Sequence, residues 1–116
     1  MAVLQRHEDQ LILELSKWER LGAMHQSPIT SVSNVISVTA HPNLWAKGII
    51  RGVRAPGTGI FLFILLGSLW SRKNEDFCAI YGKKSGFVIE LRDSEFDRWL
   101  FTTSQSEKEI NLLIGR

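Results

Sequence analysis

Alternating apolar and polar positions run through most of the chain and predict a protein built mainly of β-strands. Near the N-terminus, Leu11, Leu13 and Leu15 form one apolar face, and β-branched residues crowd the segment 35–39. The segment 59–70 is apolar at nearly every position, which is typical of a strand buried on both faces or of a pair of strands. In chain order, the expected strands are 10–15, an edge strand at 28–30, 35–39, 59–70, 77–81, 87–91 and 97–103.

Short polar segments separate these strands and predict turns at 31–34, 71–76, 82–86 and 92–95. Two lysines and two glycines at 82–86 favour a hairpin turn between the strands on either side. The segment 44–59 has no regular pattern and holds four of the nine glycines, so we expect it to be a long irregular loop.

A short helix is expected directly after the first strand. Ser16 with Glu19 three residues later forms a capping box, in which each side chain accepts a hydrogen bond from the other residue's backbone N–H. The box predicts a helix over 17–24, and a strand continuing through Trp18 is the alternative.

The C-terminal segment shows the clearest helical pattern. Ser104 and Glu107 form a second capping box, Gly115 provides a stop, and the helix is expected over 105–114. Its apolar face, which would dock on the rest of the protein, comprises Ile110, Leu113 and Ile114.

A run of antiparallel strands followed by one amphipathic helix must hide the edges of its sheet. We therefore expect a curled antiparallel sheet or partial barrel, with the C-terminal helix covering one open end. A chain of 116 residues is long enough for a hydrophobic core, and 1–116 is expected to form one domain.

The glycine-rich segment 50–60 reads IRGVRAPGTGI and resembles the RG-x-RAPGTG-I stretch of a group of small bacterial proteins. Other similar pieces are 15–16 (LS), 19–23 (ERLGA), 76–81 (DFCAIY) and 96–99 (FDRW). The resemblance covers nearly the whole chain and implies a bacterial pleckstrin-homology-like (PH-like) domain. That group has no assigned activity, so the resemblance implies a fold and not a chemistry.

Composition places the chain among globular proteins, with 44% hydrophobic and 22% charged residues. A formal net charge of +2 is too small to indicate a dedicated nucleic-acid binder. The distribution of charge is more informative, because no Asp or Glu occurs from Gln26 through Asn74. The basic residues of this acid-free segment predict a positive face: Lys47, Arg51, Arg54, Arg72 and Lys73.

The candidate binding residues lie in the irregular segment. Arg51 and Arg54 flank glycines there, and arginine beside glycine-rich backbone suits a phosphate or a carboxylate. An anionic ligand or a protein partner would contact four residues: Trp45, Lys47, Arg51 and Arg54. The structural alternative is that the two arginines fasten the segment to the barrel by pairing with Asp93, Glu95 or Asp97.

No catalytic, cofactor or metal motif is recognisable. The three histidines, His7, His25 and His41, lack ligand spacing. The single cysteine, Cys78, falls in an apolar strand, so a buried structural thiol is favoured over a thiol-dependent enzyme. Acids of the predicted turns are expected to be solvated: Glu75, Asp76, Asp93, Glu95 and Asp97. We therefore predict a non-enzymatic protein without a cofactor.

The same features favour a cytoplasmic protein. A lone cysteine suits a reducing compartment, and no signal-peptide pattern is visible. The longest apolar stretch, 59–70, is far shorter than the roughly 20 residues of a membrane-spanning helix.

The leading hypothesis is a binding module that takes a protein partner or an anionic ligand through 45–59. Self-association through the apolar strand 60–66 is a further route. The alternative is peripheral attachment to an anionic membrane surface, with basic residues near Trp45 and Trp70. At least two of the four tryptophans, which include Trp18 and Trp99, are expected in the core.

Overall fold

The structure is a computed structural model that describes residues 2–23, 26–45, 49–50, 53–60, 64–70, 74–82 and 85–115. At 53–60, Ile64 and Trp70 it describes the backbone alone. The described residues form two β-sheets and two α-helices, which confirms the prediction of a mainly β protein.

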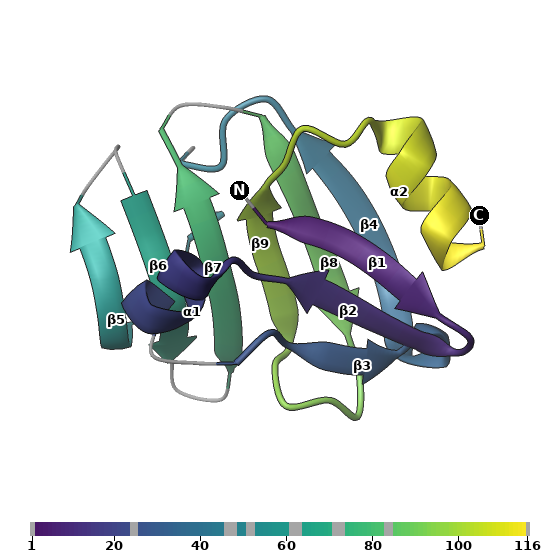
Figure 1. Cartoon of the computed structure of the whole chain (residues 1–116), viewed down its shortest axis with the longest axis horizontal. Coiled ribbons are helices and arrows are strands. Elements are labelled where there is room, and N and C mark those ends of the chain that lie inside the picture. Colours follow the sequence, from purple (N-terminus) through teal and green to yellow (C-terminus); the bar gives the residue numbers. More distant parts are fainter. Residues whose placement is uncertain are drawn as a thin grey trace.

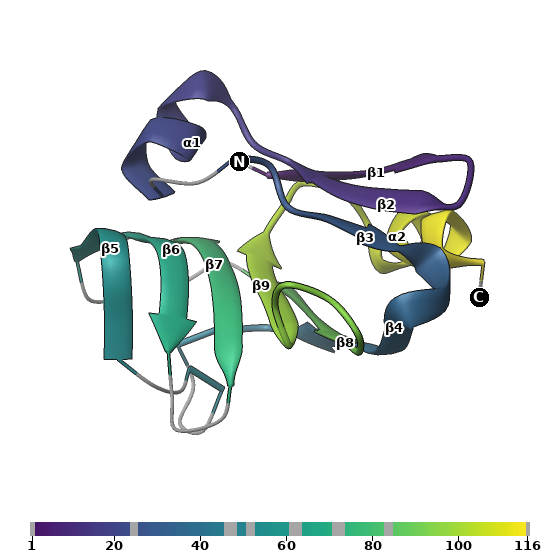
Figure 2. The ribbon, with the colours of Figure 1, turned by 90° about the horizontal axis from the view of Figure 1, so that it is seen from below.

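A small sheet lies over a large sheet as a second layer (Figure 2). The small sheet has the order β1-β2-β3 and comprises β1 (Val3–His7), β2 (Gln10–Glu14) and β3 (Ile29–Ser31). The large sheet has the order β4-β8-β9-β7-β6-β5 and comprises β4 (Val35–His41), β5 (Val53–Ile60), β6 (Ile64–Trp70), β7 (Glu75–Tyr81), β8 (Gly86–Leu91) and β9 (Arg98–Thr102). No strand pairing within the described residues joins the two sheets, so these strands do not close into a barrel.

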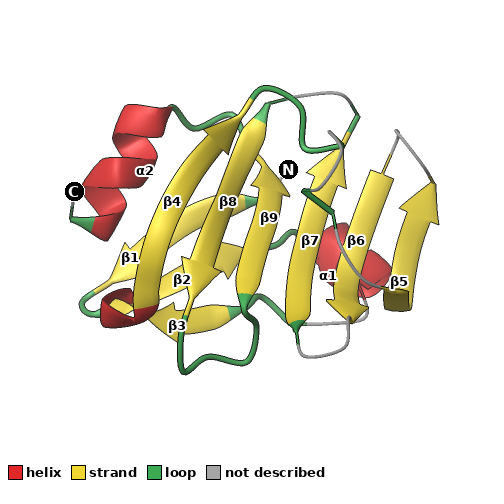
Figure 3. Ribbon diagram, turned by 180° about the vertical axis from the view of Figure 1, so that it is seen from behind, coloured by secondary structure: helices red, strands yellow, loops and turns green. Residues whose placement is uncertain are grey.

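The two helices lie toward opposite ends of the layers (Figure 1). α1 (Lys17–Ala23) follows β2 and contacts β5 and β6. α2 (Glu107–Ile114) closes the described chain and contacts β1 and β4. A 3-10 turn (Val32–Asn34) connects β3 to β4 and carries the chain from the small sheet to the large one (Figure 3).

The predicted capping box at the start of α1 is confirmed. Ser16 N donates to Glu19 Oε1 at 2.9 Å, and Glu19 N donates to Ser16 Oγ at 3.2 Å. Two backbone N–H groups that the helix leaves without a partner are thereby satisfied. The alternative of a strand continuing through Trp18 is wrong, because Trp18 lies in the helix.

At α2 the helix is confirmed but its predicted cap is wrong. The cap is Ser106, whose Oγ accepts a hydrogen bond from Glu109 N at 3.1 Å. The sequence SQSEKE offers two serine–glutamate pairs, and the second one forms, so the helix begins at Glu107. Gly115 ends the helix as predicted, in the left-handed conformation with φ of 89°.

The main hydrophobic core lies between the two sheets. Phe77 of β7 and Trp99 of β9 are buried there, and the ring of Phe77 lies 5.2 Å from that of Phe96. Leu11 and Leu13 of β2 enter the same core from the small sheet with no exposed surface. Burying each such side chain contributes roughly 1.5–3 kcal/mol, which holds the two layers together.

A second core covers the outer face of the large sheet. Its buried members are Leu44, Leu65, Leu69, Cys78, Ile80, Val88 and Leu100. The segment before β5 covers them, because Trp45, Ile49 and Ile50 pack on this cluster. The central strands are therefore apolar on both faces, as expected of strands with a layer on either side.

The order of the central strands corrects the expectation of an all-antiparallel sheet. β7 and β9 are parallel, and β9 lies between β7 and β8. The segment 82–86, predicted as a hairpin turn, instead connects β7 to β8 across the position of β9. Hydrophobic periodicity reports which faces are buried and does not report which strand is the neighbour.

Much of the segment expected to be an irregular loop is strand β5, at the edge of the large sheet. Its register with β6 shifts between Arg54 and Gly57, and Pro56 lies within this irregularity. An edge strand tolerates proline because its outer side has no ladder hydrogen bond to lose. Pro56, Gly57 and Gly59 therefore belong to an irregular edge strand and not to a loop.

Two other boundaries differ from the prediction. Ile60 pairs with Ile64, so the alternative of a pair of strands within 59–70 is confirmed, and the single strand 60–66 is wrong. β7 begins at Glu75, inside the predicted turn 71–76. In both places, pairing with a neighbour decides where a strand starts.

Replacing Gly86 by alanine should destabilise the protein strongly. A Cβ there would lie 2.3 Å from Phe101 O and 2.5 Å from Leu44 Cδ1, a backbone atom and a buried side chain. Gly82 is the matched control, because nothing lies within 4 Å of its Cβ position, although its φ is +53°. We expect Gly82→Ala to lower the free energy of unfolding by about 1–2 kcal/mol. Gly86→Ala should lower it by more in urea denaturation, and equal losses would contradict the β8–β9 contact.

Candidate functional site

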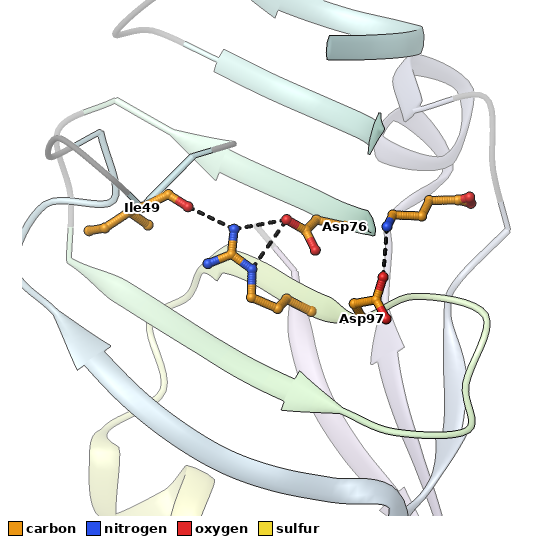
Figure 4. A network of polar contacts seen from close by, with 5 residues as sticks. Ile49, Asp76 and Asp97 are labelled. Atoms are coloured by element: carbon orange, nitrogen blue, oxygen red, sulfur yellow. Dashed lines mark hydrogen bonds and ion pairs between the residues drawn. The ribbon is translucent and has the colours of Figure 1, made fainter. Parts of the chain in front are cut away.

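An ion pair joins β7 and β9 on the outer face of the large sheet (Figure 4). Asp76 and Arg98 are partners in the parallel register, so their side chains leave the sheet on the same face. Arg98 donates to Asp76 Oδ2 from Nη2 at 2.8 Å and from Nε at 3.2 Å. The Asp76 side chain is 1% exposed and that of Arg98 12%. Two charges withdrawn from water in this way are tolerated because they neutralise each other.

The same guanidinium fastens the segment that covers the second core. Arg98 Nη2 also donates to Ile49 O at 2.7 Å (Figure 4). Trp45 Nε1 donates to Gly82 O at 2.6 Å, and the Trp45 side chain is half-buried against the second core. Side chains of Arg98 and Trp45 therefore hold this cover in place from its two sides.

Of the four predicted binding residues, the structure describes the side chain of Trp45 alone. Trp45 is a structural residue of the cover, because its indole N–H is already bonded. Lys47 and Arg51 lie outside the described residues, as does the side chain of Arg54, whose backbone belongs to β5. A binding role for these three basic residues stays a prediction.

The expectation that the turn carboxylates are solvated is wrong for Asp76, which lies in β7 with no exposed surface. Asp97 is half-buried, and its Oδ2 accepts a hydrogen bond from Glu75 N at 2.8 Å (Figure 4). The arginine that fastens the cover is Arg98, which sequence reasoning missed. The available signal was its position two residues before Leu100 in a predicted strand. Residues two apart on a strand share a face, and Leu100 belongs to the second core, so Arg98 lies on the face that this core covers.

Cys78 lies beside the ion pair in sequence and is fully buried, as predicted. Burial raises the pKa of the Cys78 thiol, and the nearby negative charge of Asp76 raises it further, while Arg98 opposes the shift. Since the thiolate is the nucleophile, a thiol held neutral and without access to solvent is poorly suited to catalysis.

A groove with a volume of about 600 Å³ lies between β1 and α2. Strand residues Val3, Leu4, Gln5, Arg6 and His7 form one wall, and helix residues Glu109, Leu112 and Leu113 with Gln105 form the other. Leu112 is 66% exposed, so its side chain serves neither core. We call this hollow the β1–α2 groove.

A smaller hollow of about 250 Å³ adjoins the ion pair, lined by Ile36, Asn74, Glu90, Leu91, Asp97 and Arg98. Its lining carries two carboxylates, Glu90 and Asp97, and one guanidinium, that of Arg98. Two of these groups already bond to β7, since Arg98 pairs with Asp76 and Asp97 accepts a hydrogen bond from Glu75 N.

Trp18 and Leu21 of α1 are 77% and 67% exposed, and they lie on the opposite side of the helix from its buried residues, Glu19 and Ala23. With Lys17 and Arg20 they make up what we call the α1 face. Trp99 is buried in the main core, and the side chain of Trp70 lies outside the described residues. Among the aromatic side chains that the structure describes, the exposed one is therefore Trp18, and not Trp45 as the sequence suggested.

Comparisons with known proteins give no further guide: family models, curated proteins and solved structures each return no match. Within the described part of the chain, no group of three or more His, Cys, Asp or Glu residues could hold a metal ion. Among the described helices, none is long and apolar enough to cross a membrane.

Replacing Arg98 by methionine should destabilise the protein by about 3–5 kcal/mol, because Asp76 would be left buried without its partner. Arg92→Met is the matched control, since Arg92 is exposed and its side chain donates only to Ser33 O. Urea denaturation of both variants measures the difference, with less than about 1 kcal/mol expected for the control. Similar losses in the two variants would show that the ion pair does not hold the sheet.

The Cys78 thiol should resist alkylation at pH 8 in the native protein and react fully in denaturant. The raised pKa leaves almost no thiolate, and burial blocks the reagent. Mass spectrometry after iodoacetamide treatment measures the modified fraction. Rapid native modification would reopen the hypothesis of a thiol-dependent enzyme.

Proposed function

We propose that this protein is a non-enzymatic binding module that receives an extended segment of a partner protein in the β1–α2 groove. The observation that carries the proposal is the groove itself. Its volume of about 600 Å³ falls within the roughly 300–1,000 Å³ typical of ligand pockets. Its lining is mainly apolar, as recognition sites usually are.

The wall formed by β1 suits an extended partner, because β1 is an edge strand of the small sheet. Leu4 N donates to Gln105 Oε1 at 2.7 Å, and Gln105 Nε2 donates to Leu4 O at 2.9 Å. The Gln105 amide thus makes the two bonds that a residue of an added strand would make. By the alternation of a strand, the backbone of Arg6 faces the same edge and can pair with an incoming chain.

The wall formed by α2 supplies the apolar anchor. Leu112 is exposed on α2 facing the groove, and Val3 on β1 is 37% exposed. A partner side chain placed between them would remove both from water, and such anchors dominate the affinity of protein interfaces. Main-chain bonds to β1 would then set the direction of the bound segment.

Other parts of the sequence-based hypothesis stay predictions beside this one. They are the PH-like architecture, binding of an anionic ligand through 45–59 and self-association. Two layers of mainly antiparallel strands with a C-terminal helix support a PH-like relationship, although the parallel β7–β9 pair is a departure from the expected pattern.

The proposal is tested with peptides selected from a random phage-displayed library against the wild-type protein. We expect the selected peptides to shift amide signals of β1 and α2 in a ¹⁵N-labelled sample. Leu112→Gln should weaken their binding roughly tenfold, because it removes the apolar contact of one leucine. Leu21→Gln is the matched control, since Leu21 is equally exposed on the other helix.

Equal weakening by the two substitutions would refute the groove as the site. So would selected peptides whose signals map away from β1 and α2, or a library that yields no binder.

A further inference from the structure

We propose that the α1 face binds an anionic lipid surface, which goes beyond the binding of a partner segment in the β1–α2 groove. The α1 face combines an exposed tryptophan and leucine with two basic residues on one short helix. It is carried by residues that neither hydrophobic core uses and that lie away from the groove (Figure 1).

The apolar part of this face is compact. Trp18 and Leu21 are three residues apart on a helix, so their side chains lie on the same side. They are 77% and 67% exposed, the two most exposed large apolar residues of the described chain. α1 packs on the sheet through the opposite side, where Ala23 is 2% exposed.

The only acid of α1 is turned inward. Glu19 is 3% exposed, and it accepts hydrogen bonds from Tyr81 Oη at 2.8 Å and from Ser16 N at 2.9 Å. Burial of the Tyr81 phenol raises its pKa, and the hydrogen bond to the negatively charged Glu19 carboxylate raises it further. Tyr81 therefore stays a neutral hydrogen-bond donor. The outward side of the helix is left with positive charge alone.

That positive charge has no internal partner in the part of the chain that the structure describes. Within the described residues, neither the exposed Lys17 nor Arg20 makes a side-chain hydrogen bond or an ion pair. The strands that α1 contacts, β5 and β6, belong to the acid-free segment from Gln26 through Asn74, so they add no negative charge beneath it (Figure 2). The α1 face is therefore complementary in charge to an anionic surface.

A lipid surface suits this combination better than a folded partner does. Tryptophan prefers the boundary between headgroups and acyl chains, and leucine inserts just below it. Lysine and arginine at the same depth meet anionic headgroups. Two inserted side chains on a seven-residue helix predict reversible attachment that depends on both apolar contact and charge.

Co-sedimentation with vesicles tests the proposal. We expect the full chain to bind vesicles of phosphatidylserine and phosphatidylcholine in equal parts, and to bind phosphatidylcholine vesicles far more weakly. Binding should fall as sodium chloride rises from about 0.1 to 0.5 M, because salt screens the charges. A blue shift of tryptophan emission on binding, absent in Trp18→Phe, would identify the inserted residue.

The double variant Trp18→Gln, Leu21→Gln should bind the anionic vesicles at least roughly tenfold more weakly while keeping the wild-type unfolding midpoint. Leu112→Gln is the control and should bind vesicles as the wild type does. The two variants therefore distinguish a failure of the lipid-binding proposal from a failure of the proposed peptide binding in the β1–α2 groove.

Three results would overturn the proposal. They are no binding of the wild type to anionic vesicles, vesicle binding that the double variant retains, and a dimer in sedimentation equilibrium that the double variant dissolves without any effect of lipid. The last result would assign the α1 face to a second copy of this chain.

Discussion

The ion pair between Asp76 and Arg98 is the interaction on which the large sheet depends. It links β7 and β9, the only parallel neighbours among the described strands, at a position with almost no access to water. A sheet with two apolar faces needs two covers. The small sheet provides one, and the described residues Trp45, Ile49 and Ile50 of the segment before β5 provide the other. Arg98 holds that segment through Ile49 O, so one guanidinium serves both strand pairing and core closure.

This arrangement changes where a working surface is expected. Trp45, the aromatic member of the four predicted binding residues, is part of the cover. The three most exposed large apolar side chains of the described chain are instead on the helices, Trp18 and Leu21 at the α1 face and Leu112 in the β1–α2 groove. These two surfaces lie toward opposite ends of the layers, so a membrane at one would not obstruct a partner segment at the other (Figure 1).

Local rules predicted local structure well. The α1 capping box, the glycine that ends α2 and the burial of Cys78 each depend on residues close in sequence. Apart from the cap of α2, where Ser106 and not Ser104 is used, the misses depend on distant neighbours. β1 has little periodicity and exists because it pairs with β2, and the parallel β7–β9 contact leaves no signal in either strand. The ion pair was hidden for the same reason, because Asp76 and Arg98 are brought together only by that register.

Hydrogen–deuterium exchange of the tryptophan indole N–H groups, followed by NMR, tests the central claim most directly. Trp45 should exchange slowly, because its Nε1 donates to Gly82 O at 2.6 Å, and Trp99 should be protected by burial. Trp18, which is 77% exposed, should exchange as fast as a free indole. Fast exchange at Trp45 together with protection at Trp18 would contradict the assignment of Trp45 to the cover and of Trp18 to an outward surface.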